Sequence, residues 1–187
     1  MSKNILICGV GGQGTVLASK VLSQAFLKEG EKVLSAETIG MAQRGGSVVS
    51  HVRIGDDVFS PLIPKGKADV IIAFEAAEAV RNLDYLKKDG TVIVNRKIVQ
   101  SVVSSLSGKT FSEEEMISFL EKNAHVTLVD SDQACKELKS SRVVNMLLLG
   151  AACKSGLIER EALKEAAKLL VKPEFYDLNV RAIDFYK

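Results

Sequence analysis

The sequence Asn-Ile-Leu-Ile-Cys-Gly-Val-Gly-Gly-Gln-Gly-Thr occupies residues 4–15 and joins a continuous apolar run to a glycine-rich turn. An apolar run of this length that ends in glycines is typical of a strand buried on both faces of a parallel sheet. Residues 15–29 follow with apolar side chains at helical spacing, and Gly30 supplies a stop signal. Residues 32–36 read as a second strand. The first forty residues therefore predict a strand–turn–helix–strand unit.

The next part of the chain predicts an antiparallel element and then a second unit of the same kind. Residues 47–54 alternate between apolar and polar side chains, residues 55–57 read as a turn, and residues 58–59 read as a short return strand. This pattern favours an antiparallel hairpin. Residues 69–74, 76–86 and 91–94 then read as strand, helix and strand, with a turn at residues 89–90.

The last third of the chain is mostly helical. Ser112 and Glu115 form a capping box that opens a helix to about residue 122, whereas the Ser-rich residues 96–110 are ambiguous. We further expect a strand at 126–129 and helices at 143–154, 159–170 and from 173 to about 185. The fold class is therefore α/β, in three α/β/α layers, with a mixed, mostly parallel sheet of βαβ units plus one antiparallel hairpin. We expect one domain over residues 1–187.

Composition excludes several classes of protein. The chain has 187 residues, 47% of them hydrophobic, and its 25 Lys and Arg against 23 Asp and Glu give a net charge of only +2, which argues against a nucleic-acid partner. No apolar run approaches the roughly 18–20 residues of a membrane span. Three cysteines without CxxC spacing make neither a disulfide framework nor an iron–sulfur site. We expect free thiols in a cytoplasmic protein, with no signal peptide before the first strand.

The glycine loop at residues 9–14 fits the GxGxxG spacing, follows a strand and opens a helix. Glycines permit a tight turn and close backbone approach, and a helix N-terminus attracts an anion. Glu37 lies 23 residues past Gly14, near the position at which a Rossmann fold keeps its ribose-binding acid. Two interpretations remain open here: a nicotinamide or flavin site, and a turn that only packs closely against a neighbouring element.

A second glycine cluster, Gln43-Arg44-Gly45-Gly46, follows the second strand directly. Loops that follow parallel strands leave the same edge of a sheet, so this cluster, Glu75 and Asn95 should all lie near the first glycine loop. Because the glycines next to Arg44 let the backbone pass close to a ligand, Arg44 could bind an anion there, or it could make a structural salt bridge. The candidate cofactor-binding residues are Gly11, Gly12, Gln13, Gly14, Gln43, Arg44, Gly45 and Gly46.

No residue pattern predicts a catalytic group or a metal site in this chain. His51 and His125 have no Cys, Ser or metal-ligand partner at a useful spacing, and we expect both to be structural or on the surface. The acidic run at residues 113–115 suits a helix start because of the helix macrodipole. If the protein takes part in an enzyme reaction, the reacting groups lie on something else.

Several segments together resemble one family. The residues are Gly9 to Gly14, the run Glu37-Thr38-Ile39-Gly40-Met41-Ala42-Gln43-Arg44-Gly45-Gly46-Ser47-Val48-Val49-Ser50-His51-Val52-Arg53, then Ser60-Pro61-Leu62-Ile63, Gly66 to Asp69, Phe74-Glu75, Asn145 to Ala151, and Leu178-Asn179. They resemble the small (beta) subunits of indolepyruvate:ferredoxin oxidoreductases, within the gamma-domain family of 2-oxoacid:acceptor oxidoreductases. The resemblance covers nearly the whole chain, and the segment from Met41 to Ser47 is its most specific part. One departure is the sequence of residues 182–185.

The resemblance implies an activity that the residues alone do not. It implies oxidative decarboxylation of arylpyruvates to an acyl-coenzyme A with reduction of ferredoxin, in a complex with a large (alpha) subunit that carries thiamine diphosphate and iron–sulfur clusters. This chain would bind no cofactor alone, would be inactive in isolation and could help to dock coenzyme A as co-substrate. Two alternatives stay open: a gamma subunit for another 2-oxoacid, such as 2-oxoglutarate or pyruvate, and a free-standing nucleotide-binding module.

Overall fold

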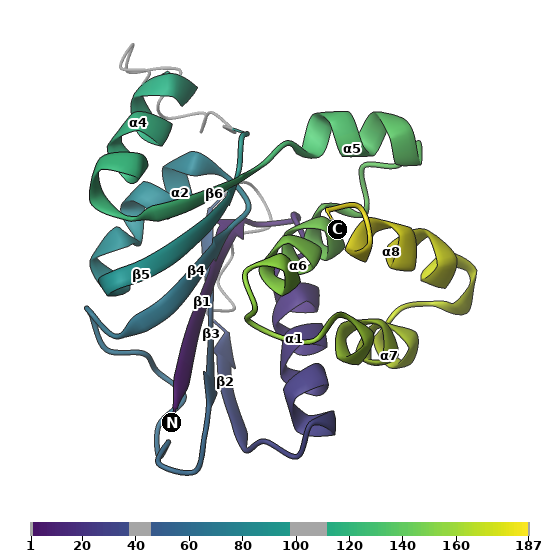
Figure 1. Cartoon of the computed structure of the whole chain (residues 1–187), viewed down its shortest axis with the longest axis horizontal. Coiled ribbons are helices and arrows are strands. Elements are labelled where there is room, and N and C mark those ends of the chain that lie inside the picture. Colours follow the sequence, from purple (N-terminus) through teal and green to yellow (C-terminus); the bar gives the residue numbers. More distant parts are fainter. Residues whose placement is uncertain (1, 38–45, 98–111, 187) are drawn as a thin grey trace.

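The protein is represented by a computed structural model, which describes residues 2–37, 46–97 and 112–186. Six strands form one sheet in the order β2-β3-β1-β4-β5-β6 (Figure 1). The pairs β1–β4, β4–β5 and β5–β6 are parallel, while β3 runs antiparallel to both β1 and β2. The strands are β1 (Lys3–Val10), β2 (Val33–Glu37), β3 (Ser47–Ile54), β4 (Ala68–Ala73), β5 (Leu86–Asn95) and β6 (His125–Val129).

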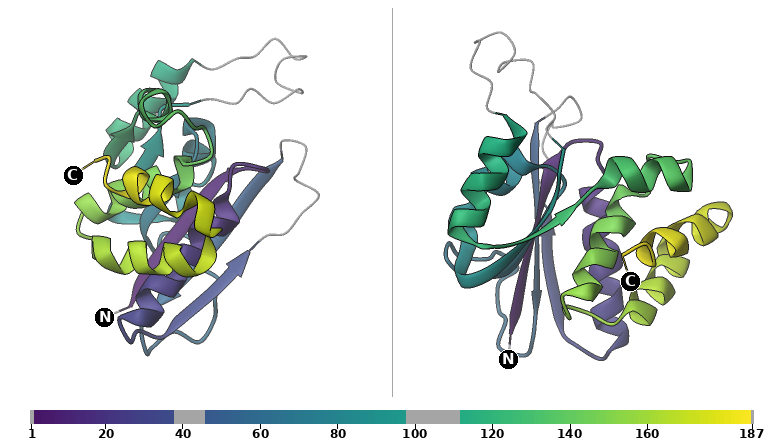
Figure 2. Two further views of the ribbon diagram at one scale, coloured as in Figure 1. Left: turned by 90° about the vertical axis from the view of Figure 1, so that its right-hand side faces the viewer. Right: turned by 45° about the horizontal axis from the view of Figure 1, so that its top comes forward.

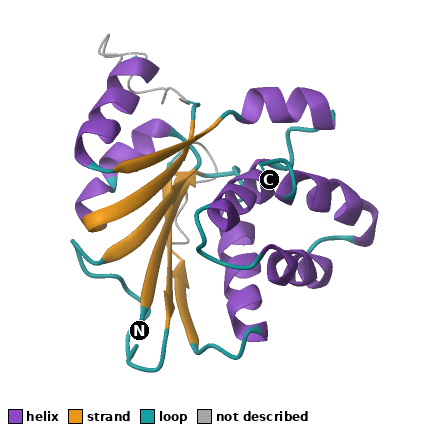
Figure 3. Ribbon diagram, in the orientation of Figure 1, coloured by secondary structure: helices purple, strands orange, loops and turns teal. Residues whose placement is uncertain are grey.

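Helices cover both faces of this sheet, as the colouring by element type in Figure 3 shows. On one face lie α1 (Thr15–Lys28), α6 (Val144–Lys154), α7 (Arg160–Leu170) and α8 (Tyr176–Ile183), and on the other lie α2 (Ala76–Arg81) and α4 (Glu113–Asn123) (Figure 2). The short α5 (Ser131–Leu138) joins β6 to α6, and the 3₁₀ turns η2 (Leu83–Tyr85) and η3 (Pro173–Phe175) precede β5 and α8. The expected α/β/α fold with a mixed sheet is confirmed.

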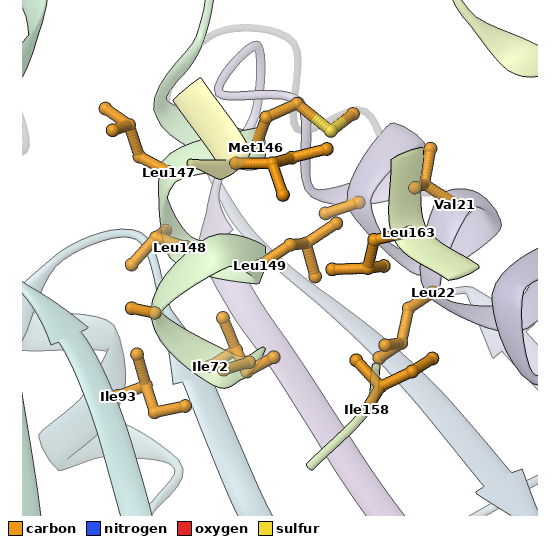
Figure 4. Close-up of a cluster of buried hydrophobic side chains, with 14 of the residues drawn as sticks. Val21, Leu22, Ile72, Ile93, Met146, Leu147, Leu148, Leu149, Ile158 and Leu163 are labelled. Carbon is orange, nitrogen blue, oxygen red and sulfur yellow. The ribbon is translucent and has the colours of Figure 1, made fainter. Parts of the chain in front are cut away.

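The alternation of side chains along the strands separates two cores. In β1, Ile5 and Ile7 face the α1 layer, whereas Leu6 and Cys8 face the α2 layer, and all four are fully buried. Strands buried on both faces explain why β1 reads as a continuous apolar run. Helix α6 is apolar on every side because it lies between the sheet, α1 and α8 (Figure 4). A Cβ on Gly150 would come within 2.4 Å of the Ile183 carbonyl oxygen, so a glycine is required where α6 crosses α8.

The predicted hairpin between residues 47–54 and 58–59 is wrong, because its second strand is not formed. Residues 58–59 form no strand, and β3 pairs instead with β1 and β2. Residues 55–67 form a loop instead. The side chains of Val58 and Ile63 anchor this loop, since they are only 1% and 3% exposed. The first predicted unit is also modified: β1 and β2 are parallel to each other, but β3 lies between them.

The other expected elements differ mainly at their ends. The predicted helix at 76–86 is α2 followed by η2, and the predicted turn at 89–90 lies within β5, where Asp89 has φ 63° and the register with β4 shifts. The capping box of Ser112 and Glu115 is present at the start of α4. Helix α5 was not predicted, although Asp130 caps it by accepting hydrogen bonds from the backbone of Asp132 and Gln133.

Candidate functional site

The carboxyl ends of the four parallel strands meet at a cleft of about 510 Å³. The chain leaves β1 through α1 on one face and leaves β4 through α2 on the other, so the connections diverge at this point of the sheet (Figure 1). Open α/β sheets bind ligands where connections diverge in this way. The lining residues are Gly12, Gln13, Gly14, Phe74, Asn95, Lys97, Ser131, Asp132, Cys135, Ser141, Arg142, Val144 and Asn145.

The first glycine loop forms one wall of the cleft, and its own contacts hold it in shape. The Gln13 side chain accepts a hydrogen bond from the backbone of Val10 at 2.7 Å, and the Gln13 backbone donates to the Val10 carbonyl at 3.2 Å. Gly14 has φ 87°, a left-handed conformation that favours glycine, and it ends the loop as the N-cap of α1. No side chain caps the N-terminus of α1, which begins directly after the cleft residue Gly14.

A second helix begins at the same cleft without a side-chain cap. Helix α6 starts at Val144, and a Cβ placed on Gly14 would lie 3.2 Å from Nδ2 of Asn145. The Oδ1 atom of Asn145 accepts from the Met146 backbone at 2.9 Å, but its Nδ2 group has no acceptor among the described residues. Asn145 is only 5% exposed. Nδ2 is not among the fully buried unpaired atoms of the described residues, so it is open to the cleft and can donate a hydrogen bond to a ligand there.

Two cations complete a positive site. Arg142 forms no ion pair with any described residue, and Lys97 lies 3.6 Å from Asp132 in an exposed, weak pair. Two open helix N-termini add partial positive charge at the same place. The site therefore has donors and charge suited to phosphate oxygens, with apolar surface from Phe74 and Val144 beside them.

The Cys135 thiol also lines this cleft. Burial raises its pKa, the negative charge of Asp132 adds to the rise, and Lys97 opposes it. All three cysteines are free, as the sequence predicted, and Cys8 is fully buried. A thiol with a raised pKa is mostly protonated near neutral pH, so Cys135 is not poised as a nucleophile.

The second glycine cluster lies at this edge as far as the structure describes it. The Gly11 backbone donates to the Gly46 carbonyl at 3.0 Å, which brings the two predicted glycine loops together. Gln43, Arg44 and Gly45 lie outside the described residues, so the predicted position of Arg44 stays a prediction.

Glu37 and Asn95 make structural hydrogen bonds, and Glu75 is buried. Glu37 accepts a hydrogen bond from the Ser19 hydroxyl at 2.8 Å, and β3 separates its strand from β1, unlike the adjacent strands of a Rossmann fold. Asn95 donates to the Phe74 carbonyl and accepts from the Ser131 backbone, which ties the ends of β4, β5 and α5 together. Glu75 is buried beside Cys8 on the α2 side of the sheet.

The sequence alone assigned no role in the site to three residues that line the cleft, Asn145, Arg142 and Lys97. Asn145 was noted only as part of a segment that resembles the family, and all three lie far along the chain from the glycine loop. The two histidines are as expected: His51 is buried and accepts from the Ile63 backbone at 3.2 Å, and His125 is exposed. Across residues 2–37, 46–97 and 112–186, no three His, Cys, Asp or Glu side chains gather as metal ligands, and no helix is long and apolar enough to span a membrane.

Comparison with known proteins gives the family. The model of the pyruvate ferredoxin/flavodoxin oxidoreductase family matches residues 4–185. A protein from Pyrococcus horikoshii named indolepyruvate oxidoreductase subunit IorB is 40% identical over 97% of this chain and 92% of its own length. The common gamma subunit of pyruvate/ketoisovalerate oxidoreductases from Pyrococcus furiosus is 29% identical over 93% of this chain and 89% of its own length.

A solved structure shows the same fold. The crystal structure of pyruvate oxidoreductase subunit PORC from Thermotoga maritima superimposes with a TM-score of 0.72 at 25% identity, over 97% of this chain and 93% of that one. Proteins with this fold therefore include subunits of assembled oxidoreductases.

Proposed function

Because the chain belongs to the pyruvate ferredoxin/flavodoxin oxidoreductase family, we propose that it is the small subunit of an indolepyruvate:ferredoxin oxidoreductase. The observation that carries this proposal is the 40% identity over 97% of the chain to an indolepyruvate oxidoreductase subunit, against 29% to a pyruvate/ketoisovalerate gamma subunit. The chain works as part of an enzyme that oxidises 2-oxoacids. We expect this complex in the reducing cytoplasm, where its three free thiols would stay reduced.

The reaction divides between this chain and a large (alpha) subunit. The 2-oxoacid loses carbon dioxide, two electrons pass to ferredoxin, and the acyl group forms a thioester with coenzyme A. Thiamine diphosphate supplies the carbanion chemistry, and iron–sulfur clusters carry the electrons; we assign both to the large subunit.

The cleft at the carboxyl edge fits the phosphate groups of coenzyme A. The N-termini of α1 and α6, whose N-cap residues make no side-chain cap, the Nδ2 group of Asn145 and the cations Arg142 and Lys97 are suited to bind anionic oxygens. We place the glycine loop, Gly11, Gly12, Gln13 and Gly14, and the cluster Gln43, Arg44, Gly45 and Gly46 at this docking site. In this role the chain binds and orients the co-substrate and provides no catalytic group.

Co-purification with the large subunit tests the function directly. We expect a stable complex that reduces ferredoxin with indolepyruvate and coenzyme A, and no activity from this chain alone. A panel of 2-oxoacids distinguishes the alternatives: preference for pyruvate or 2-oxoglutarate would favour another gamma-type subunit. Turnover by the chain without a partner would contradict the proposal.

The Arg44→Ala variant tests the docking role. Loss of a charge-assisted contact to an anion costs roughly 1.5–3 kcal/mol, so we expect about a ten- to hundredfold loss of coenzyme A affinity in the complex while the chain stays folded. Unchanged assembly and kinetics would leave Arg44 with a structural role only.

A further inference from the structure

A second cavity, an apolar groove of about 280 Å³, lies on the α1 side of the sheet. It runs between the start of α6 and the corner at which α7 passes through η3 into α8, and Leu17 of α1 contributes to its wall; Figure 2 shows α6, α7 and α8 grouped on this side. Leu170 and Phe175 line the groove with exposures of 39% and 38%. Large apolar side chains that line a cavity and remain this exposed indicate a surface that is covered in an assembly.

The charged residues that line this groove are both positive. Its only charged lining residues are Arg142 and Lys172, and neither makes an ion pair within the described part of the chain. Other lysines on the same layer are neutralised: Lys28 pairs with Glu165 at 2.6 Å, and Lys164 pairs with Asp184 at 3.1 Å. The groove is thus apolar inside and positive at its rim, which fits an apolar side chain that has a carboxylate next to it.

Arg142 connects this groove to the coenzyme A cleft, because it lines both cavities. The proposed function requires the large subunit to bring its cofactors to the mouth of that cleft. A partner lying there would also reach the groove.

We propose that the groove binds a segment of the large subunit in which an apolar side chain is flanked by Asp or Glu. The apolar side chain would pack against Leu170, Phe175 and Leu178, and the carboxylate would face Lys172 and Arg142. This inference rests on the proposed function, and it adds which surface of this chain contacts the large subunit.

Binding of purified large subunit to variants of this chain tests the proposal. Truncating apolar anchors at an interface typically weakens binding strongly, so the double variant Leu170→Ala, Phe175→Ala should bind about ten- to hundredfold more weakly. The matched control is Phe119→Ala, since Phe119 is 47% exposed on α4, across the sheet. Circular dichroism melts show that each variant is folded. Saturating large subunit should restore turnover by the double variant.

A charge variant tests the rim separately. The side chain of Lys172 is exposed, so the Lys172→Glu variant should leave the core intact. We expect about tenfold weaker binding and a smaller dependence of the dissociation constant on salt, because one attractive pair is lost and a repulsive one is gained. Equal affinity and salt dependence for Lys172→Glu and the wild type would contradict an acidic partner.

A photo-crosslinking amino acid at position 175 identifies the occupant. We expect a crosslink to one peptide of the large subunit that contains an apolar residue beside Asp or Glu. A crosslink to a second copy of this chain, or to a basic segment, would overturn the proposal. Failure of the wild-type chain to bind the large subunit would contradict the proposed function itself. An active wild-type complex with unaffected groove variants would contradict only the groove.

Discussion

The two edges of the sheet differ in how far their polar groups are hydrogen-bonded within the chain. At the amino edge, Asn4 accepts a hydrogen bond from Arg53 at 2.7 Å, donates to the Lys67 carbonyl at 2.9 Å and, through its backbone, donates to Asp69 at 2.7 Å. Arg53 also donates to the carbonyls of Ser60 and Leu62, so the loop 55–67 is held by many contacts.

At the carboxyl edge, α1 and α6 begin without side-chain caps, Nδ2 of Asn145 lacks an acceptor, and Arg142 lacks an ion pair among the described residues. These donors and cations line the cleft and are available to a ligand, whereas the satisfied network at the amino edge serves stability. Each of the following variants or conditions should affect one edge and leave the other unchanged.

The largest effect is expected from Asn145→Asp. This change keeps the acceptor for the Met146 backbone, removes the open donor and places a negative charge in the cleft. Lost donation and like-charge repulsion should weaken coenzyme A binding by about 100- to 1000-fold, or roughly 3–4 kcal/mol. Calorimetric titration of the assembled complex measures it. The melting temperature should not fall, because a carboxylate at a helix N-terminus is favourable. Unchanged affinity would remove Asn145 from the site.

Asn4→Ala should have the opposite pattern. It leaves the Nε group of Arg53 and the Lys67 carbonyl without their partner at a buried position, which costs about 2–3 kcal/mol of unfolding free energy. Urea unfolding of the isolated chain measures the loss. The KM for coenzyme A in the complex should stay at its wild-type value, and a raised KM would show that the two edges are coupled.

The pH dependence of stability should test the contact between His51 and the loop 55–67. Burial lowers the pKa of His51, whose Nδ1 accepts from the Ile63 backbone, so the unfolded chain binds a proton more readily than the folded one. Stability should therefore fall as the pH drops below about 6.5, by at most about 1.4 kcal/mol per pH unit for this group. His51→Gln retains an acceptor and cannot titrate, and its unfolding free energy should depend less on pH over the same range. An identical pH dependence in both proteins would assign the effect to other groups.

The smallest effect is expected at Cys135. Burial raises the pKa of this thiol, so alkylation by iodoacetamide should be slow near pH 7 and should accelerate as the pH rises. Coenzyme A bound in the cleft should slow it further, by a few-fold. Cys153, outside the cleft, has a pKa raised to about 11 by burial and should show no protection. Protection of both thiols, or of neither, would speak against ligand binding beside α5.

Much of the fold could be predicted from local patterns, because the buried strands are continuous apolar runs and the longer helices are periodic. The pairing of β3 could not be predicted in this way. An alternating pattern identifies a strand but not its neighbours, and the pairing with β1 and β2 depends on the whole sheet. Helix α5 was missed because its apolar face is small, consisting of Ala134, Cys135 and Leu138, although Asp130 offered a cap signal.

The site shows the same limit. The glycine loop and the meeting of two loops at one edge follow from strand direction, and the Gly11–Gly46 hydrogen bond places Gly46 beside the first loop. Asn145 could not be assigned from sequence, because it looks like one polar residue within an apolar helix. Its importance comes from tertiary packing, which brings it next to Gly14, more than a hundred residues away.

Hydrogen–deuterium exchange of the assembled complex, with and without coenzyme A, tests most directly whether the open groups at the carboxyl edge bind the ligand. The account predicts slower exchange for the amides of residues 12–17 and 143–146 when coenzyme A is added, and no change in residues 55–67. Protection confined to the loop 55–67, or no protection in either glycine loop or α6 despite saturating coenzyme A, would contradict it.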